Sequence, residues 1–465
     1  MDSRRGRQLL LRSVGVSLIL AACTRGTPTT NSLAATSSAA PAPAHAVEPA
    51  WTGDTSGFTS PPVVNGRVVY VPSEEGGLYA FPSSCAAICS PAWIGNTGPI
   101  AVGSQSLNWN PNKPTVAGGS IYVRSKAPHP KVYAFPTSCT ESGATCDSTW
   151  TAPTATPSDA TRDDFYLSPV IAGDTVYIGT FGRGLIALST SCVGTCDPKW
   201  SSSINGLWPP VIQGHTVFQQ TQDRLYALDV RTGDVIWQSA RAPKGFLSEP
   251  TLARGMVFIT LRSNRGSAPA LYAFPQRCPG LCHPLWTASV PDLYVDGAVV
   301  HGDRVYFGTE TATGTGVGHV YGFPLHCGTD QGACKPVWTA KTSGEIGFFD
   351  VAFSGDVVIA TSWEQSEMEA FPLNCGQPTC ARLWSFQGTD PDHSFYPITI
   401  SNGVVYEADR TGHLYALPVA CRSDGGTCEP SWVWTSPDAL TTPAVIPGKL
   451  FTTSSSGHVY AFDLP

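Results

Sequence analysis

The sequence is poor in charge and lacks a helical pattern. Charged residues make up 14% of the chain, against about a quarter in an ordinary globular protein, and its repeating units show no helical period in their apolar residues. The mainly apolar stretch Leu9–Leu20 is shorter than the roughly 20 residues that a permanent membrane span needs. These absences leave no support for a helical domain or a spanning helix.

Positive charge is also scarce. The formal net charge is −7, and because residues 1–22 carry +3, the rest of the chain carries −10. An acidic surface disfavours nucleic acid and anionic lipid as partners. We therefore expect that the protein binds no nucleic acid and contacts a membrane only through an attached lipid. We also expect a monomer.

Cys23 is the predicted site of that lipid. Three arginines precede the apolar run, and Leu20-Ala-Ala-Cys23 resembles the lipobox of bacterial lipoproteins, which are cut before the Cys and acylated on its thiol. We predict a signal peptide over residues 1–22, a flexible Thr/Ser/Ala/Pro tether over 23–48, and a location on the outer side of the membrane in a bacterial envelope. The alternative is an ordinary secretory signal with Cys23 there by chance.

Beyond the tether the chain repeats a hairpin, seen most clearly in Leu225–Trp237. There Leu-Tyr-Ala-Leu alternates large and small residues as a strand does, an Asp-to-Gly turn follows, and Val-Ile-Trp returns as the next strand. Each unit also has a glycine before a Val-Tyr-like strand. These glycines are Gly66, Gly118, Gly173, Gly214, Gly255, Gly302, Gly355, Gly403 and Gly448.

The repeat predicts an all-β propeller. Nine units of four short strands recur at intervals of 41 to 55 residues, which is typical of four-stranded propeller blades, so residues 49–465 are predicted to form one nine-bladed ring. Repeats of a β-helix are shorter, and sandwiches do not repeat. Because propellers usually have four to eight blades, eight blades with one displaced unit is the alternative.

Ring closure is predicted from the two ends of the repeat. The last unit lacks its Trp strand, while residues 48–51 (Glu-Pro-Ala-Trp) resemble residues 429–432 (Glu-Pro-Ser-Trp). We therefore predict that residues 49–51 supply the outer strand of the last blade and remove the open edge.

Fourteen of the fifteen cysteines fall into seven local pairs. Each pair stands where the unit with the Asp-to-Gly turn has that turn, so we predict seven disulfides at the necks of the hairpins, each contributing about 2 kcal/mol through loop entropy. Bridges on this scale require an oxidising compartment. The pairs are Cys85/Cys89, Cys139/Cys146, Cys192/Cys196, Cys278/Cys282, Cys327/Cys334, Cys375/Cys380 and Cys421/Cys428.

Metal and haem sites are less favoured interpretations of the cysteines and histidines. Zinc needs four converging ligands, but each Cys pair belongs to a separate blade. Cys278–His283 resembles a haem attachment motif with one residue too many. His319, His413 and His458 share one slot in three different units and cannot converge. We expect no metal site.

The unit Leu225–Trp237 resembles the repeat of the pyrroloquinoline-quinone (PQQ) propellers, and the resemblance extends over residues 49–465. It implies a propeller fold but not one function, because some members are quinoprotein alcohol dehydrogenases and others are non-catalytic, including an outer-membrane assembly lipoprotein. The dehydrogenases carry adjacent cysteines above the quinone, and this sequence has no Cys-Cys pair. Their Ca²⁺-binding acids and catalytic Asp cannot be assigned here. We expect no catalytic residue and no cofactor, with PQQ and Ca²⁺ as the alternative.

The loops between blades are long, aromatic and acidic, and most stand just before an innermost strand. Convergent aromatics at a channel mouth suit a protein or a small ligand, although packing between blades is an alternative role. We predict a non-catalytic, lipid-anchored, extracytoplasmic binding scaffold; a PQQ-dependent dehydrogenase and a carbohydrate-binding propeller are the alternatives. The predicted binding residues are Trp109, Tyr166, Trp208, Phe246, Tyr294, Phe349 and Tyr396.

Overall fold

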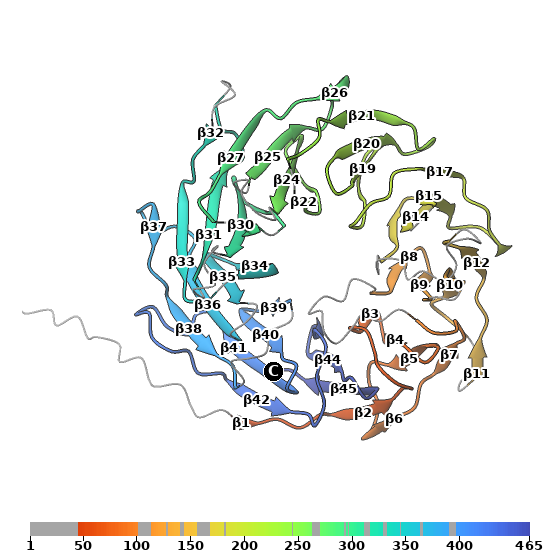
Figure 1. Ribbon diagram of the computed structural model, residues 1–465. Coiled ribbons are helices and arrows are strands. Elements are labelled where there is room, and N and C mark those ends of the chain that lie inside the picture. Colours follow the sequence, from red (N-terminus) through yellow and green to blue (C-terminus); the bar gives the residue numbers. More distant parts are fainter. Residues whose placement is uncertain are drawn as a thin grey trace, which may run out of the picture. The chain divides into compact units, whose positions relative to one another are not determined.

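The described part of the protein is built of β-strands (Figure 1). The computed structural model describes residues 45–100, 113–126, 129–139, 144–155, 168–180, 183–243, 245–262, 270–292, 294–295, 297–310, 317–328, 333–344, 346–362, 366–389 and 397–465. Within these ranges no helix has the length and apolar character needed to cross a membrane.

The predicted nine blades are confirmed. Nine sheets follow one another along the chain, each with four antiparallel strands at its heart, ordered from the innermost strand to the outer, Trp-bearing one. Blades 1 to 3 consist of β3 (Val63–Asn65), β4 (Val68–Ser73), β5 (Gly77–Pro82) and β7 (Trp93–Gly95); β8 (Thr115–Ala117), β9 (Ser120–Arg124), β10 (Lys131–Pro136) and β12 (Trp150–Pro153); and β13 (Val170–Ala172), β14 (Thr175–Thr180), β15 (Gly184–Ser189) and β17 (Trp200–Ser202).

The remaining blades repeat this order. Blades 4 to 6 consist of β18 (Val211–Gln213), β19 (Thr216–Gln220), β20 (Leu225–Asp229) and β21 (Val235–Ser239); β23 (Thr251–Ala253), β24 (Met256–Arg262), β25 (Ala270–Pro275) and β27 (Trp286–Ser289); and β29 (Val299–His301), β30 (Arg304–Glu310), β31 (Gly318–Pro324) and β33 (Trp338–Thr342). Blades 7 to 9 consist of β34 (Ile346–Ser354), β35 (Val357–Ser362), β36 (Glu367–Pro372) and β38 (Trp384–Gln387); β39 (Thr399–Ser401), β40 (Val404–Ala408), β41 (His413–Pro418) and β42 (Trp432–Thr435); and β43 (Ala444–Ile446), β44 (Lys449–Thr453), β45 (His458–Asp463) and β2 (Trp51–Asp54).

The turn between the first two strands of each blade explains the repeated glycine. The nine glycines have φ between 56° and 78°, a left-handed conformation that costs glycine little. The second strand that follows is buried on both faces, as β14 shows along its whole length, because neighbouring blades cover it from both sides.

The outer-strand tryptophans hold neighbouring blades together. Trp237 of blade 4 packs between Phe218 of its own blade and Phe274 of blade 5, with ring centroids 6.1 and 6.3 Å away. Its Nε1 donates a hydrogen bond of 3.0 Å to the carbonyl of Gln276, also in blade 5. The Trp of the repeat is therefore a contact between units as well as a core residue.

The hairpins that carry the cysteine pairs make a second contact between neighbouring blades, one that the sequence did not predict. The second arm of each hairpin pairs in parallel with the outer strand of the preceding blade, at the perimeter of the ring (Figure 1). The pairs are β6 (Ile88–Cys89) with β2, β11 (Ala144–Cys146) with β7, β16 (Gly194–Thr195) with β12, β26 (Gly280–Cys282) with β21, β32 (Ala333–Cys334) with β27, β37 (Thr379–Cys380) with β33, and the single bridge Thr427–Ser385 on β38.

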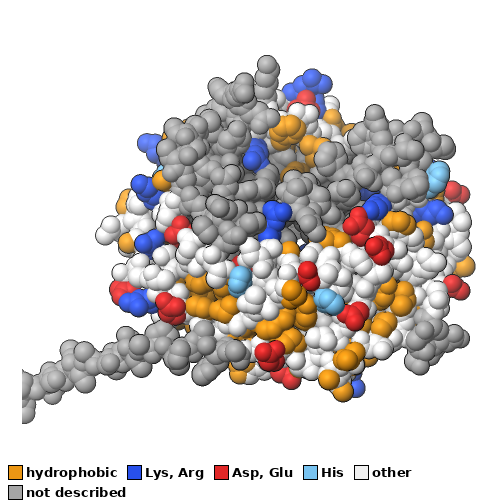
Figure 2. Space-filling model, turned by 60° about the horizontal axis from the view of Figure 1, so that its bottom comes forward, with side chains coloured by type: hydrophobic (Ala, Val, Ile, Leu, Met, Phe, Trp, Pro, Cys, Tyr) orange, Lys and Arg blue, Asp and Glu red, His pale blue; other side chains and the backbone are white. Residues whose placement is uncertain are grey.

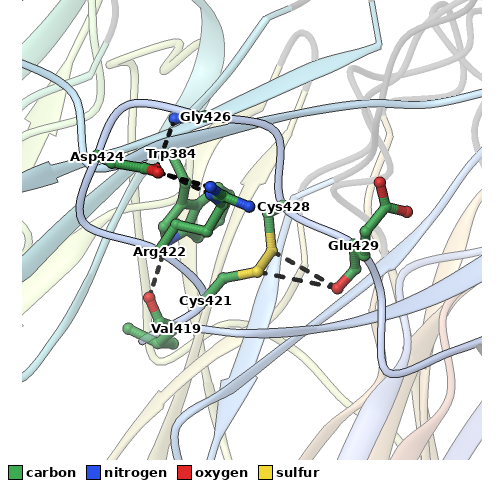
Figure 3. Close-up of a disulfide and its surroundings, with 8 residues drawn as sticks. All are labelled: Trp384, Val419, Cys421, Arg422, Asp424, Gly426, Cys428 and Glu429. Atoms are coloured by element: carbon green, nitrogen blue, oxygen red, sulfur yellow. Dashed lines mark hydrogen bonds and ion pairs between the residues drawn. A yellow bond between two sulfur atoms is a disulfide. The ribbon is translucent and has the colours of Figure 1, made fainter. Parts of the chain in front are cut away.

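All seven cysteine pairs lie at disulfide distance, with Cα atoms 5.6 to 6.2 Å apart. The second cysteine of each pair is at most 4% exposed and shares a core cluster with the Trp of the preceding blade. Figure 3 shows this at blade 8, where the hairpin of Cys421 and Cys428 lies beside Trp384 of blade 7, whose Nε1 donates to Val419 O at 2.8 Å.

The chain ends close the ring in the way predicted. β2 pairs with β45 in antiparallel register, Trp51 opposite Ala461; the strand runs from residue 51 to 54 rather than from 49 to 51 because its pairing continues past the Trp. One more strand precedes it. β1 (His45–Ala46), expected to be tether, pairs in parallel with β42 and takes the place of a hairpin there.

Candidate functional site

The structure describes the side chains of two of the seven predicted binding residues, Trp208 and Phe246. Tyr294 and Phe349 lie on β28 (Tyr294–Val295) and β34, and their side chains are outside the described part. The other three aromatics and the predicted lipid site also lie outside the described residues: Trp109, Tyr166, Tyr396 and Cys23.

Short strands continue the innermost edge of the sheets in blades 5 and 6, and we call this extended edge the rim. β22 (Phe246–Leu247) pairs with the far end of β24, with Phe246 opposite Arg262. β28 pairs with the far end of β30 in the same way, with Tyr294 opposite Glu310. Phe246 and Tyr294 therefore occupy equivalent positions on neighbouring blades.

Trp208 joins this rim to blade 4. Its Nε1 donates a hydrogen bond of 3.1 Å to Leu247 O on β22, and its own carbonyl accepts one of 2.9 Å from Gln219 Nε2. Trp208 is half-buried and contributes to the contact between blades, whereas the side chain of Phe246 is 39% exposed. The two predicted residues thus differ in their exposure to solvent.

A small apolar cavity lies between the same two blades. It measures about 100 Å³ and is lined by residues 239–243, which end blade 4, and by Leu247, Ile259, Tyr272, Phe274 and Pro284 of blade 5. We call this cavity, with Trp208 and Phe246 on the rim, the blade 4–5 seam. Small-molecule sites usually measure about 300–1,000 Å³, so the cavity suits one aliphatic side chain of a partner better than a cofactor.

Charged residues of both signs lie near the blade 4–5 seam, so it is neither a purely acidic nor a purely basic site. Arg241 pairs with Asp223 at 3.3 Å beside the cavity. Glu249 stands just before innermost strand β23, and burial raises its pKa to about 7. Elsewhere on the surface, Figure 2 shows acidic, basic and hydrophobic side chains interspersed on the described residues. The sequence did not identify Glu249, although its position before the Pro of the repeat places it next to an innermost strand.

The repeated histidine slot proves to be a hydrogen-bond network in each of three blades. In blade 6 the buried Asp292 accepts bonds from Thr309 Oγ1 (2.7 Å), Tyr321 OH (2.9 Å) and His319 Nδ1 (3.0 Å). Burial raises the pKa of this carboxyl, but the three hydrogen bonds outweigh it and the net pKa is lowered. All three bonds end on Oδ2, so this oxygen ties the loop before the innermost strand to β30 and β31.

The same pairing recurs in blades 8 and 9. His413 lies 3.3 Å from Asp409, and His458 Nδ1 donates to Asp54 Oδ1 at 2.6 Å. Among the residues that the structure describes, no group of His, Cys, Asp and Glu could hold a metal ion.

The described residues do not supply the groups with which the quinoprotein dehydrogenases hold a quinone and Ca²⁺. The sequence has no adjacent cysteines, and the fourteen paired ones lie in the perimeter hairpins. The described part of the chain likewise supplies no cluster of acids for the cation.

Comparison with solved structures agrees with this architecture. The chain is similar to BamB from Moraxella catarrhalis (17% identity, TM-score 0.50, 76% of this chain and 94% of that one). It is also similar to the computationally designed Ika8 protein (8%, 0.53, 90% and 100%) and to Saccharomyces cerevisiae Sqt1 (9%, 0.50, 90% and 100%). At these identities the likeness concerns the fold.

The family is established by the sequence itself. No curated protein matches the chain. The family model described as outer membrane protein assembly factor BamB matches residues 142–239 and 195–420, more than half of the chain. Together with the nine blades and their repeated Trp contacts, this match shows that the chain belongs to the PQQ-like β-propeller family.

Proposed function

We propose that the protein is a non-catalytic scaffold of the bacterial cell envelope, held to a membrane by a lipid on Cys23, that binds another protein at the blade 4–5 seam. The observation that carries the proposal is the apolar cavity of about 100 Å³, whose lining includes Leu247, the chain neighbour of the exposed Phe246. A buried slot for one side chain beside an exposed aromatic is the usual form of an interface hot spot.

Two further observations support the proposal. The matched family model is described as an assembly factor for outer membrane proteins, which favours a role in handling other proteins. Seven cysteine pairs at disulfide distance favour an oxidising compartment outside the cytoplasm, in agreement with an exported lipoprotein.

The test is site-specific crosslinking. A photoreactive phenylalanine analogue placed at residue 246 in the producing cell should give one discrete adduct with another protein. The matched control places it at Ile88, which is 80% exposed on the perimeter of another blade. Phe246→Ser should then lose the same partner in co-purification by at least tenfold, while Ile88→Ser keeps it.

A reconstitution assay tests the alternative function, a PQQ-dependent dehydrogenase. The soluble part reconstituted with PQQ and Ca²⁺ should show no quinone absorbance and no alcohol-dependent dye reduction. Activity in that assay, or equal adducts from residues 246 and 88, would overturn the scaffold proposal.

A further inference from the structure

Blade 3 departs from the perimeter pairing of the other blades. Its outer strand, β17, ends a four-stranded sheet, and no described residue pairs with the far edge of that strand. Each of the other eight outer strands is covered by a hairpin arm, by the Thr427–Ser385 bridge or by β1. Blade 3 therefore presents a bare sheet edge among the described residues.

The cause lies in blade 4, which has the Asp229–Gly233 turn in place of a stapled hairpin. The turn folds back onto Trp200: its Val230 O accepts the indole N–H at 3.0 Å, and a Cβ on Gly233 would lie 2.4 Å from the indole ring. It covers the tryptophan and stops short of pairing with β17. The edge is thus a consequence of the shorter turn.

Exposure of β17 agrees with this. Ser201, the residue after the Trp, is exposed, while the equivalent residue of every other blade is half-buried. Trp200 is 8% exposed, whereas Trp150 and Trp237, in the blades on either side, are 1% exposed.

The equivalent residues of covered blades show which backbone groups of β17 point outward from the sheet edge. In blade 7 the equivalent residue, Ser385, donates its N–H to Gly426 O at 3.1 Å and accepts from Cys428 N at 2.7 Å. In blade 2, Thr151 O accepts from Cys196 N at 2.8 Å. Ser201 holds the same position, so its N–H and C=O form the same two-bond template, and a sheet edge of this kind recruits an extended peptide.

We propose that β17 binds an extended segment of a partner protein as a parallel fifth strand. The segments that cover the other blades define its chemistry: an uncharged residue, commonly Thr, Leu or Ile, opposite Ser201, followed by a small residue opposite Ser202. Thr195, Leu281 and Ile88 hold the first place elsewhere. β1 shows that a segment with neither a hairpin nor a disulfide can take the same place. The proposal rests on the scaffold function and adds a second contact to it.

The test uses a fluorescein-labelled peptide with the sequence of residues 191–197 and both cysteines replaced by alanine, Ser-Ala-Val-Gly-Thr-Ala-Asp. Fluorescence anisotropy should show saturable binding to the mature chain. Ser201→Pro removes the outward N–H and should weaken binding at least tenfold, while Ser201→Thr, which keeps both backbone groups, should stay within twofold. Absence of saturable binding to the wild type would overturn the proposal.

A second variant guards against misfolding of the proline variant. Replacing residues 229–234 with the disulfide-bridged hairpin of blade 5, residues 275–283, should cover β17 from within and abolish peptide binding with Ser201 intact. Undiminished binding to this variant would contradict the proposal. Dimerisation that requires residues 24–44 and is lost in Ser201→Pro would assign the edge to a second copy's tether instead. Because the readout is at β17, its failure is distinguishable from failure of crosslinking at Phe246.

Discussion

The indole Nε1 of Trp237 donates a hydrogen bond of 3.0 Å to the backbone carbonyl of Gln276 in the next blade. Among the described residues, six more tryptophans donate the equivalent hydrogen bond to a carbonyl of the next blade: Trp51, Trp150, Trp200, Trp286, Trp338 and Trp384. The ring is therefore stabilised by one contact used repeatedly, and each copy of that contact can be tested alone.

Trp237→Phe should lower the free energy of unfolding by roughly 1–3 kcal/mol, because it leaves the part-buried Gln276 carbonyl without its donor. Urea unfolding followed by circular dichroism measures the change. Ile236→Ala, at a neighbouring side chain that is 45% exposed, is the control and should stay within about 0.5 kcal/mol. Equal midpoints for the two variants would show that the bond contributes nothing.

Removal of the closing strand should be far more damaging. A chain that begins at Thr55 lacks β1 and β2, loses the buried Trp51 at a cost of roughly 3–5 kcal/mol, and exposes the edge of β45. It should unfold at lower denaturant or aggregate. Chains that begin at Ala44 and at Val47 separate the effects, since the first keeps both strands and the second loses β1 only. If all three melt alike and stay monomeric, the β2–β45 pairing does not close the ring in solution.

Glu249 should make stability fall as pH rises through the weakly acidic range. Burial raises its pKa from 4.5 to about 7, so between these values the folded state binds more protons than the unfolded state. The stabilisation is fully present below pH 4.5 and is lost by about pH 7, with an upper limit of about 3 kcal/mol. Denaturant midpoints at several pH values should show a slope that flattens in Glu249→Gln. An unchanged slope would mean that Glu249 titrates normally.

The cysteine pairs should be bridged within their own hairpins. Mass spectrometry of a non-reduced digest should find Cys85–Cys89 and its six counterparts, and no bridge between blades. Replacing both Cys278 and Cys282 with alanine should cost about 2 kcal/mol from loop entropy and more if β26 then leaves β21. Hydrogen exchange at Gln238, opposite Leu281, reports that loss. Free thiols in the native protein would contradict the pairing.

Cys23→Ser should release the protein from the membrane fraction or leave an uncut precursor. Fractionation with immunoblotting distinguishes the two results. Cys85→Ser is the control, since it alters a perimeter hairpin and should leave membrane partition unchanged. Membrane partition and size that survive Cys23→Ser would argue for an ordinary secretory signal.

The blade architecture could be predicted because each strand and turn has a residue pattern that lies within one repeat unit. The glycine turn, the Val-Tyr strand and the Trp strand recur in register, and the resemblance of residues 48–51 to 429–432 identified the closing strand. The parallel pairing between Leu281 and Gln238 produces no such pattern, because the two residues belong to different units and the contact is made by backbone hydrogen bonds. Likewise, sequence cannot separate a packed Trp208 from an exposed Phe246, since both are aromatics in loops before an innermost strand.

The β2–β45 pairing also dictates an order of events. Trp51 and Ala461 are separated by most of the sequence, yet they face each other in one sheet, so β2 must wait for β45 to be synthesised. Blades 1 to 8 can assemble from local hairpins as the chain emerges, because their antiparallel strands are close in sequence. The ring remains an open arc, with two unsatisfied ends, until the final six-residue strand is made. Synthesis of β45 is thus the step that converts an aggregation-prone arc into a closed ring.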